Sequence, residues 1–129
     1  MTDRTTRIAD LKKKIERFNE ARDWRQWHKP KNLAMSILIE AAELAEHFQW
    51  GDHEAITRFP KAKWREIESE LADVLIYCLT FANRTDIDIS RAVEAKIRYN
   101  NRKYPARVVR GNRGVEDRIR YAWRKRRKR

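Results

Sequence analysis

The chain has 129 residues, of which 39% are charged and 41% hydrophobic, and its formal net charge is +12. This length suffices for one domain with a buried core. No stretch approaches the roughly 20 apolar residues of a membrane span, and residues 1–14 lack the apolar core of a secretory signal. The single cysteine, Cys78, excludes a disulfide framework. We therefore expect a cytoplasmic protein with no membrane partner.

The positive charge is concentrated near the C-terminal end. Residues 106–129 contain 11 Lys and Arg against two acids, a net charge of +9, which leaves +3 of the total +12 for residues 1–105. We expect a nearly balanced domain at 1–105 and a basic, partly disordered tail at 106–129. Within this tail, the composition of residues 115–124 is compatible with a short helix.

The composition predicts an all-α protein, because helix formers dominate and Gly and Pro number only three each. Apolar residues recur at three- and four-residue steps. This pattern predicts four helices, at about 4–23, 31–49, 63–84 and 89–103, with a loop or short helix at 51–62. Short connections favour an antiparallel four-helix bundle. Two of the helices are polar on an inner face, so we expect oligomerisation to complete the bundle.

Four acidic residues form two pairs on the second and third predicted helices. Glu40 and Glu43 lie in IEAAELAEHFQW, and Glu70 and Asp73 lie in EIESELADVLIY. The i, i+3 spacing places both carboxylates of a pair on one helical face. A solvated surface is the ordinary explanation for any one of them, but Glu40 and Glu70 lie at the edge of an apolar stripe. If the two helices face each other, four carboxylates converge, which is costly unless a cation compensates them.

The residue types in this quartet indicate which metal would bind. Carboxylate oxygens suit Mg²⁺, with Mn²⁺ as the alternative. A di-iron bundle would require two Glu-x-x-His motifs, and the chain has none. Since Mg²⁺ commonly bridges to substrate phosphates, we expect hydrolysis or transfer at a phosphate, with the four acids as metal ligands and catalytic residues.

Aromatic and basic residues outside the quartet are candidates for nucleotide binding. Trp24 and Trp50 lie at helix ends in polar surroundings, where an indole can stack on a base. Lys96, Asn100 and Lys103 share one face of the fourth helix, although a solvated basic face explains them equally well. Three glycines do not make a phosphate-binding loop, so metal and side chains must hold the phosphates.

These features together resemble the all-α nucleoside triphosphate pyrophosphohydrolases, the MazG-like superfamily. The family pattern of Glu-x-x-Glu, a spacer and Glu-x-x-Asp is met by Glu40, Glu43, Glu70 and Asp73. The resemblance covers about residues 8–105 and is carried by two strings, ERFNEARDWRQWHKPKNLAMSILIEAAELAEHFQW and ELADVLIYCLTFANRTDIDISRAVEAKIRYNNRKYP. The remainder of the chain has no counterpart in this pattern.

The resemblance implies Mg²⁺-dependent conversion of a deoxynucleoside triphosphate, dCTP or a modified dCTP, to the monophosphate and pyrophosphate. It implies a homo-oligomer, dimer or tetramer, with sites near subunit boundaries. It also implies a base pocket using Trp24 and Trp50, and further nucleotide contacts from His28, Tyr77, Lys96 and Asn100. In this mechanism Lys96 and Lys103 offset the charge of the leaving pyrophosphate. The number of metal ions, the base preferred and the glutamate that accepts a proton stay open.

Two other functions compete with this one. A small helical module could bind nucleic acid through its Arg-rich tail, with weak, salt-sensitive contacts that are lost when residues 107–129 are removed. An inactive helical scaffold would show no stabilisation by Mg²⁺. The tail could also bind nucleic acid alongside catalysis in residues 1–105.

Overall fold

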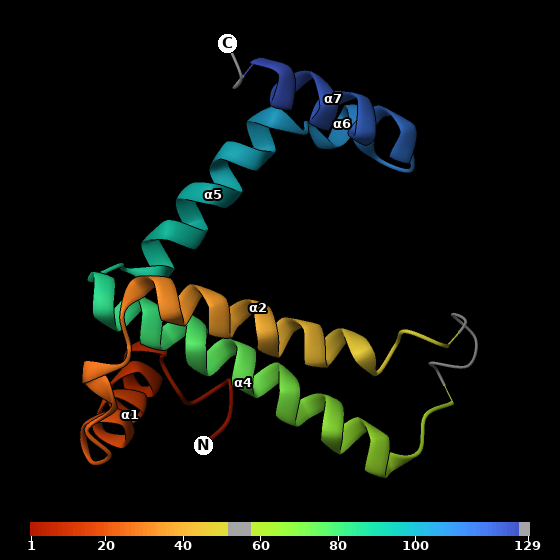
Figure 1. The fold of residues 1–129 in the computed structure, drawn as a ribbon. Helices are drawn as coiled ribbons and strands as arrows, with labels where there is room; N and C mark the ends of the chain where they lie inside the picture. The colour runs from red at the N-terminus through yellow and green to blue at the C-terminus, as the bar shows by residue number, and fades with distance from the viewer. Residues whose placement is uncertain (52–57, 127–129) are drawn as a thin grey trace. The chain divides into compact units, whose positions relative to one another are not determined.

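The computed structural model describes residues 1–51 and 58–126, with side chains as far as Arg124, and confirms the all-α prediction for this part of the chain (Figure 1). Its helices form two compact units, residues 1–89 and 90–129. The first unit contains α1 (Ile8–Glu20), the short 3₁₀ helix η1 (Trp24–Gln26), α2 (Pro30–Glu46) and α4 (Lys61–Thr85); the second contains α5 (Ile89–Lys103), α6 (Ala106–Val109) and α7 (Arg113–Arg126). The four predicted helices thus correspond to α1, α2, α4 and α5. Most of the predicted loop or short helix at 51–62 lies outside the described residues.

Local signals set several helix ends. The backbone N–H of Arg7 donates to Asp10 Oδ2 at 3.2 Å, which caps the start of α1. Pro30 occupies the first position of α2, where a missing N–H costs nothing. Asp86 ends α4 in the left-handed conformation, with φ 54°, and the next N–H, of Ile87, donates to the Ala82 carbonyl at 3.0 Å.

The first unit is built on two long helices, α2 and α4, which run antiparallel side by side (Figure 1). Helix α1 packs against α4. Leu33, Ile67, Leu79 and Ala82 are the buried apolar residues, between 0% and 7% exposed. This is a small core for helices of 17 and 25 residues.

A buried polar contact ties α1 to α4. Asn19 and Thr80 are 3% and 2% exposed. The Asn19 side-chain amide donates to Thr80 Oγ1 at 3.4 Å, and this hydroxyl donates to the Ile76 carbonyl one turn earlier at 2.8 Å. The Asn83 amide adds a second link, donating to the Lys12 carbonyl at 3.0 Å. These bonds place α1 on the C-terminal half of α4.

Thr80→Val is expected to destabilise the fold by about 1–3 kcal/mol, because it leaves the buried Asn19 amide without its acceptor. Urea unfolding followed by circular dichroism measures this loss. Thr85→Val is the matched control: Thr85 makes the same backbone bond, to the Phe81 carbonyl at 2.8 Å, without a partner on α1. Equal losses in the two variants would contradict a specific role for the Asn19–Thr80 contact.

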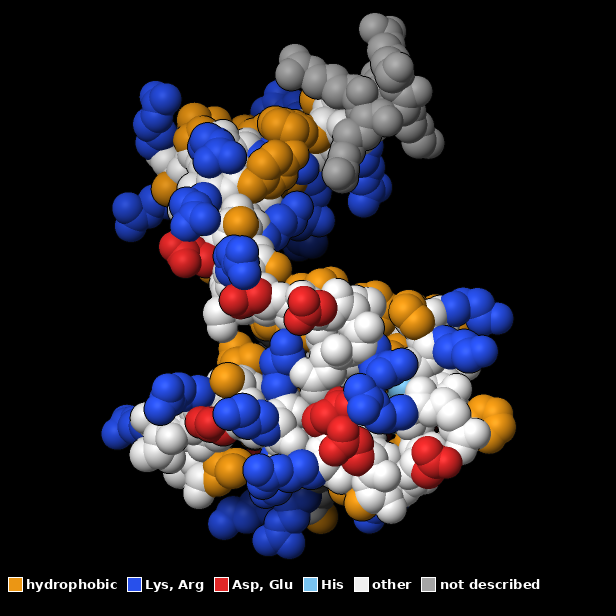
Figure 2. Space-filling view, turned by 90° about the vertical axis from the view of Figure 1, so that its left-hand side faces the viewer, with side chains coloured by type: hydrophobic (Ala, Val, Ile, Leu, Met, Phe, Trp, Pro, Cys, Tyr) orange, Lys and Arg blue, Asp and Glu red, His pale blue; other side chains and the backbone are white. Residues whose placement is uncertain are grey.

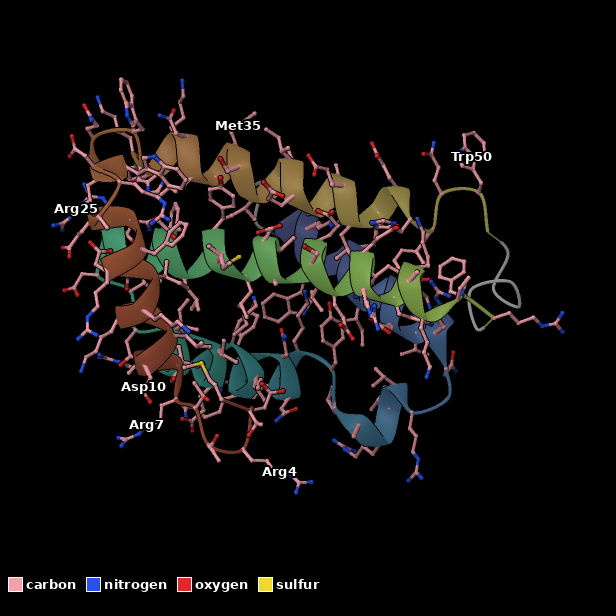
Figure 3. The ribbon with its side chains drawn as sticks, turned by 90° about the horizontal axis from the view of Figure 1, so that it is seen from below. Arg4, Arg7, Asp10, Arg25, Met35 and Trp50 are labelled. Atoms are coloured by element: carbon pink, nitrogen blue, oxygen red, sulfur yellow. The ribbon has the colours of Figure 1, made fainter. Side chains whose placement is uncertain are left out.

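The first unit also has an uncovered apolar face on α2 and α4. Met35, Leu38 and Ile39 on α2 are 51–62% exposed, and Leu71 and Leu75 on α4 are 56% and 51% exposed. In Figure 3, Met35 points away from α4. We call these five residues the apolar face. Within each helix they follow the three- and four-residue spacing that is typical of buried side chains.

In the second unit, an aromatic contact joins α5 and α7. The Trp123 ring packs edge-on against Tyr99, with centroids 5.4 Å apart. Ile119 and Val115, one and two turns before Trp123, are part-buried as well. Much of the segment predicted to be partly disordered is helical, because Val115, Ile119 and Trp123 give α7 an apolar stripe.

No described helix has the length and apolar character that a membrane span requires.

Candidate metal and nucleotide site

Three of the predicted acids form a cluster between α2 and α4. Glu40, Glu43 and Glu70 each place a carboxylate oxygen so that all three lie within 4.8 Å of one another. The antiparallel arrangement explains why. Glu40 lies three residues before Glu43 on α2, and Asp73 lies three residues after Glu70 on α4, so a register that joins Glu43 to Glu70 also brings Glu40 toward Asp73.

The electrostatics of Glu40 show that all four acids interact. Burial raises the pKa of Glu40 above its ordinary value, and the negative charges of Glu43, Asp73 and Glu70 raise it further. Glu40, Glu70 and Asp73 are part-buried, whereas Glu43 is exposed. The structure therefore places the four acids as one interacting group. The oxygens of Glu40, Glu43 and Glu70 are hard ligands at a spacing that a divalent cation can span, and a cation would relieve the repulsion within the group.

The pKa of Glu40 gives a test of this repulsion in metal-free protein. A carboxyl whose pKa is raised by folding destabilises the folded state when it is charged, and this penalty is absent below its unfolded pKa near 4.5. Glu40→Gln should therefore raise the melting temperature by a few degrees near neutral pH, and the gain should disappear as the pH falls toward 4.5. Thermal unfolding in EDTA measures it.

The control for this experiment is Glu68→Gln, which removes one exposed carboxylate from α4 outside the cluster. Its melting temperature should follow the wild type at every pH. A Glu40→Gln variant that is less stable than the wild type in EDTA at pH 7 would show that the Glu40 charge is not repelled by its neighbours.

Two residues that were not predicted lie at the rim of the acidic cluster. Glu43, Glu46, His47, Lys63 and Glu70 line a pocket of about 450 Å³. His47 Nδ1 lies 3.9 Å from Glu66 Oε2, and Lys63 Nζ lies 3.2 Å from the same oxygen. One signal was available, since His47 follows Glu43 by one helical turn. Lys63 reaches the pocket through the packing of α4 on α2.

At the other end of α2, Trp24 and His28 lie together. Trp24 is 42% exposed, and its ring meets His28 edge-on, with centroids 6.1 Å apart. His28 Nδ1 is buried and has no hydrogen-bond partner among the described residues. Burial lowers the pKa of His28, and the positive charge of Arg84 lowers it further against the opposing effect of Glu16. The lowered pKa favours the neutral form of the His28 ring.

Trp24 and Trp50 do not share a pocket within one chain, so the predicted base pocket is not assembled by a single copy. Trp24 precedes α2, and Trp50 follows it, 89% exposed. The 17 residues of α2 separate them by about 25 Å at 1.5 Å per residue. Figure 3 shows Trp50 and Arg25, the neighbour of Trp24, at opposite ends of the helix.

The predicted nucleotide contact Tyr77 lies on α4, one turn after Asp73, and its side chain is part-buried.

The three predicted residues of α5 belong to the second unit. Lys96 Nζ lies 4.7 Å from the centre of the Tyr99 ring. Lys103 Nζ lies 4.8 Å from the Tyr104 ring and 5.2 Å from the Trp123 ring. Asn100 is part-buried, and its carbonyl accepts the N–H of Tyr104 at 2.7 Å. Their contact with a nucleotide stays a prediction.

Comparisons with known proteins identify the family to which the chain is related. The model of the MazG-like family matches residues 35–114, which include both acidic pairs. Rat dCTP pyrophosphatase 1 is 38% identical over 107 residues, and the human protein of that name is 36% identical over 108; each alignment covers 81% of this chain. The chain spans 63% of the length of these relatives.

A solved structure extends the comparison to three dimensions. The crystal structure of a pyrophosphatase from Archaeoglobus fulgidus DSM 4304 has a TM-score of 0.73 and 38% sequence identity to this chain. The match covers 81% of this chain and 98% of the archaeal one. The family model and these relatives together show that the chain belongs to the MazG-like family.

Proposed function

We propose that this chain is a metal-dependent nucleoside triphosphate pyrophosphohydrolase that converts a deoxynucleoside triphosphate to the monophosphate and pyrophosphate, and so removes unwanted nucleotides from the pool. The observation that carries the proposal is the cluster of Glu40, Glu43 and Glu70 within 4.8 Å, inside the region of the chain that matches the MazG-like family model. The names of the relatives, dCTP pyrophosphatase 1, favour dCTP or a modified dCTP as the substrate.

The acids would hold the metal. Glu40, Glu43 and Glu70 supply clustered oxygens, and Asp73 adds a charge that acts on Glu40. Oxygen ligands without cysteine or paired histidines favour Mg²⁺, with Mn²⁺ as a substitute. When bound, such an ion polarises phosphate oxygens and lowers the pKa of a coordinated water. The repulsion that raises the pKa of Glu40 supports the fit, because a cation would offset it.

The side chains would carry the remaining steps. Water adds its oxygen to a phosphoryl group as the bond between the α- and β-phosphates breaks. A glutamate of the cluster that is not fully used in ligation accepts the proton of this water and returns it to solvent. Lys96 and Lys103 would offset the negative charge of the leaving pyrophosphate. The products are the nucleoside monophosphate and pyrophosphate, with no redox change.

The base would be held by aromatic side chains from two copies of the chain. Trp24 and His28 form one aromatic surface, against which the base would stack. Since Trp50 lies at the far end of α2, its ring would reach the same base only from a second copy. The apolar face of α2 and α4 supplies a surface on which a second copy could pack. We therefore include a homo-oligomer in the proposal, with Tyr77 near the nucleotide.

The activity is tested by incubating the chain with each of the four common dNTPs and with methylated and halogenated dCTP. Mg²⁺, Mn²⁺ or EDTA is added, and pyrophosphate and monophosphate are measured. We expect equimolar products, dependence on the metal, and the fastest turnover with a cytosine nucleotide. Release of orthophosphate in place of pyrophosphate, or equal rates in EDTA, would contradict the proposal.

The shared pocket has its own test. Trp24→Ala and Trp50→Ala are each expected to lose most activity. If the two indoles come from different copies, mixing the two variants creates some sites with both tryptophans intact, and activity returns. If mixed and re-equilibrated variants stay inactive while wild-type protein treated in the same way keeps its activity, the two-copy pocket is wrong.

A further inference from the structure

We propose that the second unit binds single-stranded nucleic acid through the exposed face of α7 and the α6 segment. This function lies beyond the proposed hydrolysis and does not depend on it. The family model ends at residue 114, and α7 runs from Arg113 to Arg126, so family membership does not account for this helix.

The first argument is the distribution of charge between the two units. Residues 90–129 contain 16 Lys and Arg and three acids, a net charge of +13. Because the whole chain carries +12, residues 1–89 carry −1. The boundary between the compact units thus coincides with the boundary between a balanced part and a strongly basic part. Figure 2 shows Lys and Arg side chains projecting around the helices of the second unit.

The second argument is that many of these cations lack acidic partners. Arg107, Arg110, Arg113 and Arg124 are exposed and form no ion pair within the described part of the chain. Glu116, one of two acids on α7, is already paired with Arg120 at 2.9 Å. We call Arg107, Arg110, Arg113 and Arg124 the arginine set. The phosphates of a nucleic acid would neutralise these exposed cations and release counterions.

The chemistry of the surface favours a nucleic acid over a membrane. Val115, Ile119 and Trp123, the apolar stripe of α7, are part-buried, and Trp123 contacts Tyr99 and Lys103. A helix that binds a bilayer must insert such a stripe, and here it is already engaged within the unit. Twelve of the 16 cations are arginines, whose planar guanidinium groups match phosphate oxygens in a bidentate geometry.

An exposed tyrosine favours a single strand over a duplex. Tyr121 is 70% exposed, and Arg118 and Arg124 lie three residues before and after it on the same helical face. The phenol ring can stack on an unpaired base, and the two arginines can hold the phosphate backbone of the same strand. In a duplex the bases are stacked on one another and leave this ring without a partner.

Binding is tested with the full chain and a fluorescent 20-nucleotide oligo(dT), by anisotropy between 50 and 300 mM NaCl. We expect saturable binding at 100 mM NaCl that weakens steeply with salt. Replacing the four residues of the arginine set with Gln should reduce the slope of log K against log salt by about 3, at about 0.7 per phosphate contact. The matched control replaces Arg4, Lys13, Arg17 and Lys61, four exposed cations of the first unit, with Gln. It should keep most of the slope.

Variants of Tyr121 test whether the surface prefers single-stranded nucleic acid to other polyanions. Tyr121→Ala should weaken oligo(dT) binding at least about fivefold and leave a 20-base-pair duplex unaffected, whereas Tyr121→Phe should bind like the wild type. An equal loss for duplex and single strand would overturn the choice of single-stranded nucleic acid. Tighter binding to phosphatidylglycerol vesicles than to oligo(dT) at equal phosphate concentration would overturn it in favour of a membrane.

Two further results would decide against the proposed binding surface. No binding to oligo(dT) at 100 mM NaCl, or an equal loss in the arginine-set and control variants, would overturn the proposed surface. Circular dichroism of each variant verifies that the helices are intact. Pyrophosphate release by the arginine-set variant should equal that of the wild type, so failure of nucleic-acid binding and failure of the proposed hydrolysis are seen separately.

Discussion

Glu40→Gln and Asp73→Asn are each expected to reduce pyrophosphate release by more than about 100-fold. Loss of a residue that only orients a metal ligand typically costs 10–100-fold in affinity or activity, and loss of a ligand should cost at least as much. Both substitutions keep the size of the side chain, so the cavity between α2 and α4 is preserved. Initial rates with dCTP at saturating Mg²⁺ measure the effect.

The structure offers a control and a second readout for these variants. Glu68→Gln removes an exposed carboxylate from α4 outside the cluster and should leave the rate unchanged. Mg²⁺ should raise the melting temperature of the wild type, because binding to the folded state stabilises it. It should do so less in Glu40→Gln and Asp73→Asn. Near-wild-type rates in both variants, with intact helical signals, would remove the metal-site hypothesis.

Leu38→Glu is expected to dissociate the proposed oligomer and to reduce activity more than tenfold. Leu38, at 62%, is the most exposed residue of the apolar face, so a single chain tolerates a charge there. Burying an unpaired carboxylate in an apolar interface costs several kcal/mol, and about 3 kcal/mol corresponds to roughly a 100-fold weaker association. Light scattering after size exclusion measures the mass, and dCTP turnover is measured at the same concentrations.

Ala9→Glu is the matched control for this experiment. Ala9 is exposed on α1, one turn before Lys13, and the substitution adds the same charge outside the apolar face. It should leave mass and activity unchanged. A wild-type chain that is monomeric at micromolar concentration and fully active would contradict the oligomer. A monomeric Leu38→Glu variant with full activity would contradict a site that needs a second copy.

The acidic site was largely predictable because its geometry is local to each helix. The i, i+3 spacing of Glu40 with Glu43 and of Glu70 with Asp73 follows from the helical repeat, whatever the helices pack against. That the two pairs meet depends on the antiparallel register of α2 and α4, which the sequence indicates only through family resemblance. His47 and Lys63 became neighbours of the site through this same register.

The aromatic residues show what the sequence leaves undecided. Trp24 and Trp50 share a residue type and a place at helix ends, and this made one pocket plausible. The length of α2 keeps them about 25 Å apart in one chain. The basic tail shows the opposite case. Its composition was compatible with a short helix at 115–124, and α7 is present there, with Val115, Ile119 and Trp123 part-buried and Trp123 against Tyr99.

By itself, the sequence determined the all-α class, the approximate limits of the four main helices and the pairing of acids within each helix. All of these depend on residues within a few turns of one another. The tertiary structure decided which helices bring the pairs together, which apolar side chains stay uncovered, and that the two tryptophans lie apart. These features depend on packing between segments far apart in the chain, whose register local spacing does not specify.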